Sequence, residues 1–235
     1  MIGRPDEVIR RAVKANWDAI AKPLDGMGRF EEMTAQIGAI TGDERLDLSE
    51  KAVLIFCADN GIVAEGVSQA GQEVTLAVAK SMAKNASSVG RMARFAGADA
   101  IPVDIGINSD LTIDGVLDKK IAHGTRDFLI EPAMSEEETL GAIETGIALV
   151  AECKDKGYRI LATGEMGIGN TTTSSAVAAA LLGCKSALVV GRGAGLSDRG
   201  LARKREVVEN AIKKYDLYKT DAFTVLRTVG GLDIA

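Results

Sequence analysis

The chain has 235 residues, of which 46% are hydrophobic and 26% charged, the balance of a globular protein with one large core. A net charge of −5 argues against nucleic-acid binding, and no apolar run is long enough for a membrane span. Three isolated cysteines and one histidine argue against a disulfide framework, a zinc site and a serine-type triad. We therefore expect a cytoplasmic small-molecule protein without a metal or a cofactor.

The first forty residues are predicted to form two helices. Pro5 opens an apolar stripe over residues 5–21, and a Pro- and Gly-containing break ends it. The second helix is predicted to carry one apolar face, made of Phe30, Met33, Ile37 and Ile40. Since both helices precede any strand, we expect a small helical domain over residues 1–42 and an α/β domain over 43–235.

The first predicted strand, residues 52–57, is a continuous apolar run that suits the middle of a parallel sheet. Its carboxyl end leads through Asp59, Asn60 and Gly61 into a long loop that reaches Gln72. In open α/β sheets, ligands bind just beyond the carboxyl ends of the strands. The loop over residues 64–72 is thus a candidate wall of a binding site, and an ordinary surface connection is the alternative.

The middle of the chain shows alternating helix and strand patterns. In order, it predicts helices at 73–85 and 87–96, a strand at 100–106, and short strands around 111–113 and 120–122. Pro102 places the 100–106 strand near a sheet edge. Ser135 and Glu138 have the spacing of a capping box. The helix behind them is predicted to present one apolar face, made of Leu140, Ile143, Ile147 and Val150.

A glycine-rich stretch, Gly164–Thr172, lies between a predicted buried strand at 158–163 and a predicted helix at 173–182. Strand, glycine turn and helix together aim backbone N–H groups at an anion. The stretch matches neither the P-loop nor the G-x-G-x-x-G fingerprint. Glu165 is an unusual neighbour for a phosphate unless its carboxylate faces a hydroxyl or a ring nitrogen. The alternative is a tight turn with a purely structural role.

A second glycine turn, residues 191–195, follows a predicted strand at 187–190. Ser197 or Asp198 would cap the next helix, which carries Arg199, Arg203 and Lys204, and a last helix is predicted at 207–215. Two such turns on successive strands would grip one phosphorylated ligand. Arg192 and Lys204 are the expected charge partners of that ligand. For Lys204 the alternative is a solvated helix face.

Several of these segments together resemble one family. They are Lys22-Pro23-Leu24, Gly28-Arg29, Ala58–Gly61 with Gln72–Thr75, His123–Phe128 with Glu131–Met134, Gly164–Thr172 and Gly191–Lys204. In order and spacing they resemble the nicotinate-nucleotide–dimethylbenzimidazole phosphoribosyltransferases, over essentially the whole chain. The resemblance implies a pentosyltransferase of cobalamin biosynthesis. Its substrates would be nicotinate mononucleotide and 5,6-dimethylbenzimidazole or a related base, its products alpha-ribazole 5'-phosphate and nicotinate, and its assembly a homodimer.

The resemblance also assigns site residues, position by position. It implies phosphate and ribose contacts from Glu165, Gly167, Gly169, Asn170, Thr171, Arg192, Gly193 and Lys204. It implies contacts to the acceptor base from Asp59, Ser68, Ala70, Gln72, Val78 and Met166. The glutamate that would serve as general base is expected beyond Ala235, so no catalytic residue is assigned within this chain.

Two departures from the family pattern leave alternatives open. Asn60 stands where the family often has histidine, and Ala70 and Val78 stand where some members have polar side chains. The accepted base is therefore open between dimethylbenzimidazole, a purine such as adenine, and a phenolic compound. Two alternatives to a working transferase remain, a subunit that needs a complementing C-terminal chain and a non-catalytic nucleotide-binding module. The expected fold is α/β, a mostly parallel, open, Rossmann-like sheet with helices on both faces.

Overall fold

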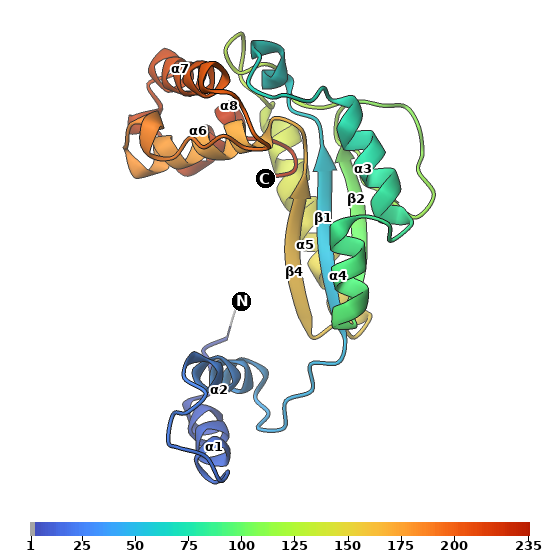
Figure 1. The fold of residues 1–235 in the computed structure, drawn as a ribbon, viewed down its shortest axis with the longest axis vertical. Coiled ribbons are helices and arrows are strands. Elements are labelled where there is room, and N and C mark those ends of the chain that lie inside the picture. The colour runs from blue at the N-terminus through green and yellow to red at the C-terminus, as the bar shows by residue number, and fades with distance from the viewer. Residues whose placement is uncertain (1–2) are drawn as a thin grey trace. The chain divides into compact units, whose positions relative to one another are not determined.

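The computed structural model of the protein describes residues 3–235 and separates into two compact units (Figure 1). The first unit ends at Ser49, and the second comprises Glu50–Ala235. None of the helices in the described residues is long and apolar enough to cross a membrane.

The first unit is a pair of helices, α1 (Glu7–Asp18) and α2 (Arg29–Thr41). Asp6 is the N-cap of α1, and its side chain accepts hydrogen bonds from the backbone N–H groups of Val8 and Ile9. The helix therefore begins after Pro5 rather than with it, because the cap satisfies N–H groups that the first turn leaves unpaired.

The apolar face predicted for α2 is not the face that α2 buries. Phe30, Met33 and Ile40 are 52%, 57% and 65% exposed, and Ile37 is half-buried. The buried face instead carries smaller side chains together with one carboxylate, namely Glu31, Thr34, Ala35, Gly38 and Ala39. A Cβ on Gly38 would lie 2.7 Å from Val13 Cγ2 of α1. The two helices approach so closely that small residues, not large ones, occupy their contact.

The second unit contains a four-stranded sheet in the order β3-β2-β1-β4, with every neighbouring pair parallel. Its strands are β1 (Lys51–Ala58), β2 (Asp99–Gly106), β3 (Leu117–Asp118) and β4 (Ile160–Met166). The central position predicted for β1 is confirmed, since β1 pairs with β2 on one side and with β4 on the other. Pro102 of β2 has no partner on β3, which pairs only with Val103 and Asp104.

Helices cover both faces of this sheet, as predicted (Figure 1). Helix α3 (Glu73–Ala83) packs on the face that presents Ile55 and Cys57, and α4 (Ser88–Ala96) packs near β2. Helix α5 (Glu136–Asp155) covers the face that presents Leu54 and Val103. Successive residues of β1 thus serve opposite cores because side chains alternate along a strand.

Three helices gather beyond the carboxyl ends of the strands, α6 (Asn170–Leu182), α7 (Asp198–Lys214) and α8 (Ala222–Val229) (Figure 1). Their apolar side chains share the largest core with the ends of β1 and β2, and Phe128, Val207, Ile212 and Val225 are completely buried there. Short 3-10 helices complete the unit, η1 (Gly61–Glu65), η2 (Ser186–Leu188) and η3 (Leu217–Lys219).

The strand predicted at 187–190 is wrong, because residues 186–188 form the 3-10 helix η2 and Leu188 is 78% exposed. Within residues 3–235 no strand pairs with the outer edge of β4. An apolar run becomes a strand only when a neighbour satisfies its backbone hydrogen bonds. For the same reason β4 is not the buried strand predicted at 158–163, and Ala162, Thr163 and Glu165 on it are exposed.

Three further predictions need correction. The short strands at 111–113 and 120–122 are absent, and the short strand is Leu117–Asp118. The capping box of Ser135 and Glu138 is confirmed, yet α5 buries Thr139, Ala142, Leu149 and Cys153 while Leu140, Ile147 and Val150 are exposed. Residues 198–214 form one continuous helix, α7, and α8 was not predicted, although Asp221 caps it as an N-cap should.

Candidate functional site

The candidate site lies where the carboxyl ends of β1 and β4 meet. These strands are neighbours, but the chain leaves β1 toward β2 on one side of the sheet, whereas β4 lies on the other side. Such a switch point opens a crevice between the segments that follow the two strands. Here Asp59 and Asn60 follow β1, and Gly167, Ile168 and Gly169 follow β4.

The glycines after β4 are required by close packing of the two segments. A Cβ on Gly167 would lie 2.2 Å from the carbonyl oxygen of Ala58, and one on Gly169 would lie 2.7 Å from Val63 Cγ2. Gly169 also has a left-handed conformation, with φ at +97°. Both constraints place the start of α6 directly beside the loop that follows β1. Helix α6 begins at Asn170, three residues earlier than predicted.

Two amides of this turn already donate hydrogen bonds within the protein. Ile168 N donates to Thr75 Oγ1 at 3.1 Å, and Asn170 N donates to the carbonyl oxygen of Gly167 at 3.1 Å. The turn therefore offers fewer free amides to an anion than a P-loop would. Most of the charge that would hold an anion here has to come from a side chain.

That side chain is Lys204 of α7. It is 1% exposed, and its Nζ donates to Thr171 Oγ1 at 2.6 Å. Within residues 3–235 it has no carboxylate partner, whereas its neighbour Arg203 pairs with Glu65 and Glu206. Burial lowers the pKa of the Lys204 ammonium. A buried cation without a counter-charge is costly unless a ligand supplies one, so Lys204 is not the solvated lysine of the alternative interpretation.

The second glycine turn passes directly over this lysine. Gly193 has a φ of +55°, and a Cβ on it would lie 2.9 Å from Thr171 Oγ1 and 3.4 Å from Lys204 Nζ. Arg192 donates through Nη1 to the carbonyl oxygen of Leu196 at 2.8 Å and pairs through Nη2 with Asp198. The two turns thus face each other as predicted, although only the first of them follows a strand.

Between the two turns lies a cavity of about 290 Å³. All eight residues predicted to contact phosphate and ribose line it, namely Glu165, Gly167, Gly169, Asn170, Thr171, Arg192, Gly193 and Lys204. From the predicted acceptor set, Ser68 and Met166 also line it. The cavity size is at the lower end of the range for small-molecule sites.

The other four predicted acceptor residues lie outside this cavity. Asp59 is buried, its Oδ2 accepts from Asn108 N at 2.8 Å, and burial raises the pKa of Asp59. Gln72 bridges the carbonyl oxygen of Asn60 and the side chain of Asn108. Ala70 is half-buried in the loop, and Val78 packs into the core between α3 and β1.

Sequence reasoning missed Asp233. Its carboxylate is buried beside the cavity, where Asn170 Nδ2 donates to Asp233 Oδ2 at 3.0 Å and also to Glu165 Oε2. Burial, and secondarily the Glu165 carboxylate, raises the pKa of Asp233 to about 7. The signal in the sequence that could have pointed to Asp233 is the preceding pair Gly230-Gly231, since paired glycines mark close packing. A Cβ on Gly231 would lie 2.5 Å from Asn60 Oδ1 and 2.7 Å from Asp233 Oδ1.

The substitution Asp233→Asn is expected to change how stability depends on pH. Because folding raises the pKa of this carboxyl from 3.8 to about 7, the folded chain holds a proton that the unfolded chain releases. The stability linked to Asp233 is therefore present below about pH 4 and lost as pH rises toward 7. In urea unfolding at pH 4, 6 and 8, the free energy of unfolding of the variant should rise relative to that of the wild type as pH rises. Parallel pH curves would contradict the assignment.

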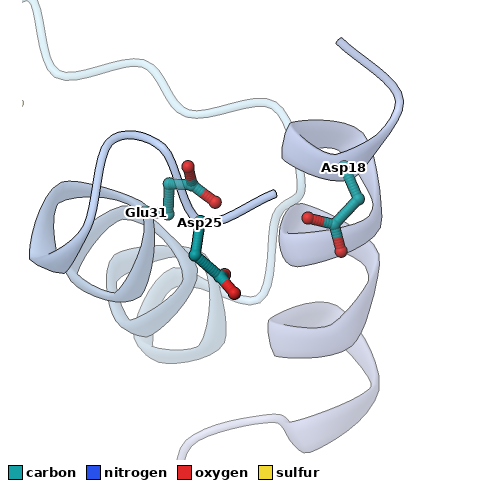
Figure 2. A group of neighbouring side chains, drawn as sticks. All are labelled: Asp18, Asp25 and Glu31. Carbon is teal, nitrogen blue, oxygen red and sulfur yellow. The ribbon is translucent and has the colours of Figure 1, made fainter. Parts of the chain in front are cut away.

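The first unit holds a separate cluster of carboxylates, Asp18, Asp25 and Glu31, whose oxygens lie within 4.8 Å of one another (Figure 2). Such a cluster suggests a cation site. The positive charge, however, is already supplied by a side chain of the protein. Lys14 Nζ lies 2.8 Å from Asp25 and 3.3 Å from Glu31, and it also pairs with Asp18. Lys22 adds a second ammonium, 2.8 Å from Glu31. The cluster therefore joins α1 to α2 and carries no metal proposal.

Glu31→Gln is expected to remove part of the acid sensitivity of the first unit. Lys22, with the Met27 N–H, lowers the pKa of Glu31 from 4.5 to about 2. The stability from this carboxylate is present above about pH 4.5 and lost as pH falls toward 2. The protein's single tryptophan, Trp17, bonds Thr34 at 2.7 Å and reports on this unit. The melting temperature, measured by tryptophan fluorescence from pH 2 to 6, should change less with pH for Glu31→Gln than for the exposed control Glu32→Gln.

The fold and the site together define an α/β protein with a cavity, lined by a buried lysine, at the switch point of a parallel sheet. The family model described as phosphoribosyltransferase matches residues 2–235, and the chain belongs to this family. The family resemblance predicted from these segments of the sequence is thereby confirmed.

Named relatives agree with this placement. The chain is 41% identical, over 232 residues, to the nicotinate-nucleotide–dimethylbenzimidazole phosphoribosyltransferase of Clostridium perfringens, covering 99% of this chain and 64% of the relative. It is 43% identical to the enzyme of the same name from Ruminiclostridium cellulolyticum, over 97% of this chain and 65% of the relative. The crystal structure of CobT from Thermus thermophilus matches with a TM-score of 0.90 and 33% identity, over 96% of this chain and 68% of that one.

Proposed function

We propose that this chain binds nicotinate mononucleotide and supports transfer of its phosphoribosyl group to 5,6-dimethylbenzimidazole or a related base. The products would be alpha-ribazole 5'-phosphate and nicotinate. The observation that carries the proposal is the buried ammonium of Lys204 between two glycine turns, which has no carboxylate partner among residues 3–235. The names of the relatives supply the substrate class. Because the chain spans 64–65% of the length of these relatives, binding and turnover are proposed and tested separately.

The chemistry sets modest demands on the protein. The bond from the anomeric carbon to the pyridinium nitrogen breaks, and a bond to an imidazole nitrogen of the acceptor forms. Nicotinate leaves with a neutral nitrogen, so no acid has to protonate it. The acceptor's N–H proton must pass to a base. Holding the phosphate and orienting the two rings therefore supplies most of the acceleration, and the base adds about 10²- to 10⁴-fold.

We assign the phosphate to Lys204, Thr171 and the turn at Gly193, and the ribose to Glu165 and Asn170. The acceptor base would lie against Ser68 and Met166, with Asp59 and Gln72 supporting the loop that carries Ser68. Ala70 and Val78 would set the shape of that side of the site. The proton acceptor would be the glutamate that the family resemblance implies, which is not among the residues assigned here. A homodimer in the cytoplasm is part of the same proposal.

Titration calorimetry with nicotinate mononucleotide tests the binding step, and chromatography of alpha-ribazole 5'-phosphate tests the transfer. We expect saturable binding by the 235-residue chain with slow product formation. Turnover at the rate of a full-length relative would overturn the assignment of the base, while leaving the substrate assignment intact. Failure to bind nicotinate mononucleotide would overturn the proposed function. Sedimentation analysis of the same sample tests the dimer.

A further inference from the structure

Two contacts join the loop that follows β1 to the segment that carries Lys204. The side-chain amide of Gln69 donates to the carbonyl oxygen of Gly195, in the second glycine turn. The guanidinium of Arg203 donates to Glu65 twice, from Nη2 to the carboxylate and from Nε to the backbone carbonyl at 3.3 Å. Both contacts join segments far apart in the sequence. Gln69 and Gly195 line the cavity described above, whereas Glu65 and Arg203 line a neighbouring hollow that Gln69 also borders.

Arg203 and Lys204 are consecutive on α7 but face different partners. Lys204 is turned inward to Thr171, whereas Arg203 is turned toward Glu65. Consecutive side chains on a helix lie about 100° apart. Because the helix backbone between them is rigid, the bond from Arg203 to Glu65 limits the rotation of α7 about its axis. That rotation decides where the Lys204 ammonium lies.

The charges around Glu65 make this bond hard to replace. The pKa of the nearby Asp127 carboxyl is raised, first by burial and then by the Glu65 carboxylate. Arg203 is the cation paired with Glu65, and it also pairs with Glu206 at 3.3 Å, whereas the cation that acts on Asp127 is Lys214. Without Arg203, Glu65 would be repelled by Asp127, and the loop from Gly61 to Gln72 would lose its tie to α7.

We propose that Arg203 and Gln69 are positioning residues for phosphate recognition. Together with Glu65 and Gly195 they form a clamp that holds the loop of residues 61–72 against α7. The clamp keeps Lys204 and the second glycine turn in place around the bound sugar phosphate. This inference rests on the proposed function, because it names the residues that set the affinity of that same site.

The test is the affinity of the 235-residue chain for nicotinate mononucleotide, measured by titration calorimetry from pH 6 to 9. Arg203→Met is expected to weaken binding roughly tenfold, the size typical of coupled neighbouring residues. Arg199→Met removes an exposed arginine one turn earlier on the same helix and should bind like the wild type. Since the clamp acts through the Lys204 ammonium, Arg203→Met should also shift the pH profile of binding, which a general loss of stability would not.

Exchanging the charges of Glu65 and Arg203 tests whether their ion pair restores the affinity. The double variant Glu65→Arg with Arg203→Glu should regain most of the affinity lost in Arg203→Met. If Arg203→Met does not fold, Gln69→Ala, at an exposed position, is the second variant to test. Its affinity for nicotinate mononucleotide is expected to fall a few fold. Equal affinities in Arg203→Met and Arg199→Met, with normal wild-type binding, would overturn the clamp alone. A wild-type chain that does not bind nicotinate mononucleotide would overturn the proposed function and the clamp with it.

Discussion

Lys204→Met is expected to weaken binding of nicotinate mononucleotide about 30-fold or more, because loss of one partner of a buried charged contact costs about 2–5 kcal/mol. The same substitution should not lower the melting temperature of the ligand-free chain. Its ammonium is 1% exposed and has no carboxylate partner in the described residues, so folding carries a desolvation cost that methionine avoids. Opposite effects on binding and on stability are the signature of a residue kept for a ligand.

Calorimetric titration and thermal melts of one preparation measure both effects. Lys213→Met is the matched control, because this exposed lysine of the same helix pairs only at the surface with Glu209. It should change neither quantity. Thr171→Val removes the hydroxyl that accepts the Lys204 bond and should weaken binding less than Lys204→Met. Normal affinity in a folded Lys204→Met variant would contradict the phosphate assignment.

Gly167→Ala is expected to destabilise the second unit by about 3 kcal/mol, the upper end for overpacked sites. The new Cβ would lie 2.2 Å from the carbonyl oxygen of Ala58 and 2.4 Å from Asp233 Oδ2. The first of these atoms is backbone at the end of the central strand, so it cannot move aside without breaking the sheet. The loss arises where β1 and β4 meet, and it should therefore also widen the site.

Gly146→Ala is the control for this substitution. Gly146 lies within α5, and a Cβ on it would meet nothing within 4 Å. Alanine is favoured over glycine inside a helix by about 0.5–1 kcal/mol, so this variant should be slightly more stable than the wild type. Urea unfolding followed by far-ultraviolet circular dichroism measures both variants. Equal midpoints for the two would show that the turn after β4 tolerates a side chain.

The sequence predicted which residues line the cavity more accurately than it predicted the buried faces of the helices. Glycine turns, Lys204 and the apolar run of β1 are local signals, and each of them carries its own physical reason. The buried faces of α2 and α5 depended on how closely neighbours approach, which made Gly38 and Ala142 internal and left Met33 and Ile147 exposed. Large apolar side chains mark a core only where the distance between elements leaves room for them.

By itself the sequence determined the parallel α/β class, the central strand, the two glycine turns and the lysine that faces them. The tertiary structure alone decided that residues 187–190 are not a strand, that Asp233 lies against Glu165 and Asn170, and that Arg203 ties α7 to Glu65. The first group follows from neighbours along the chain, whose steric and hydrogen-bonding preferences are local. The second depends on which distant segments meet, and no local pattern of the chain encodes that.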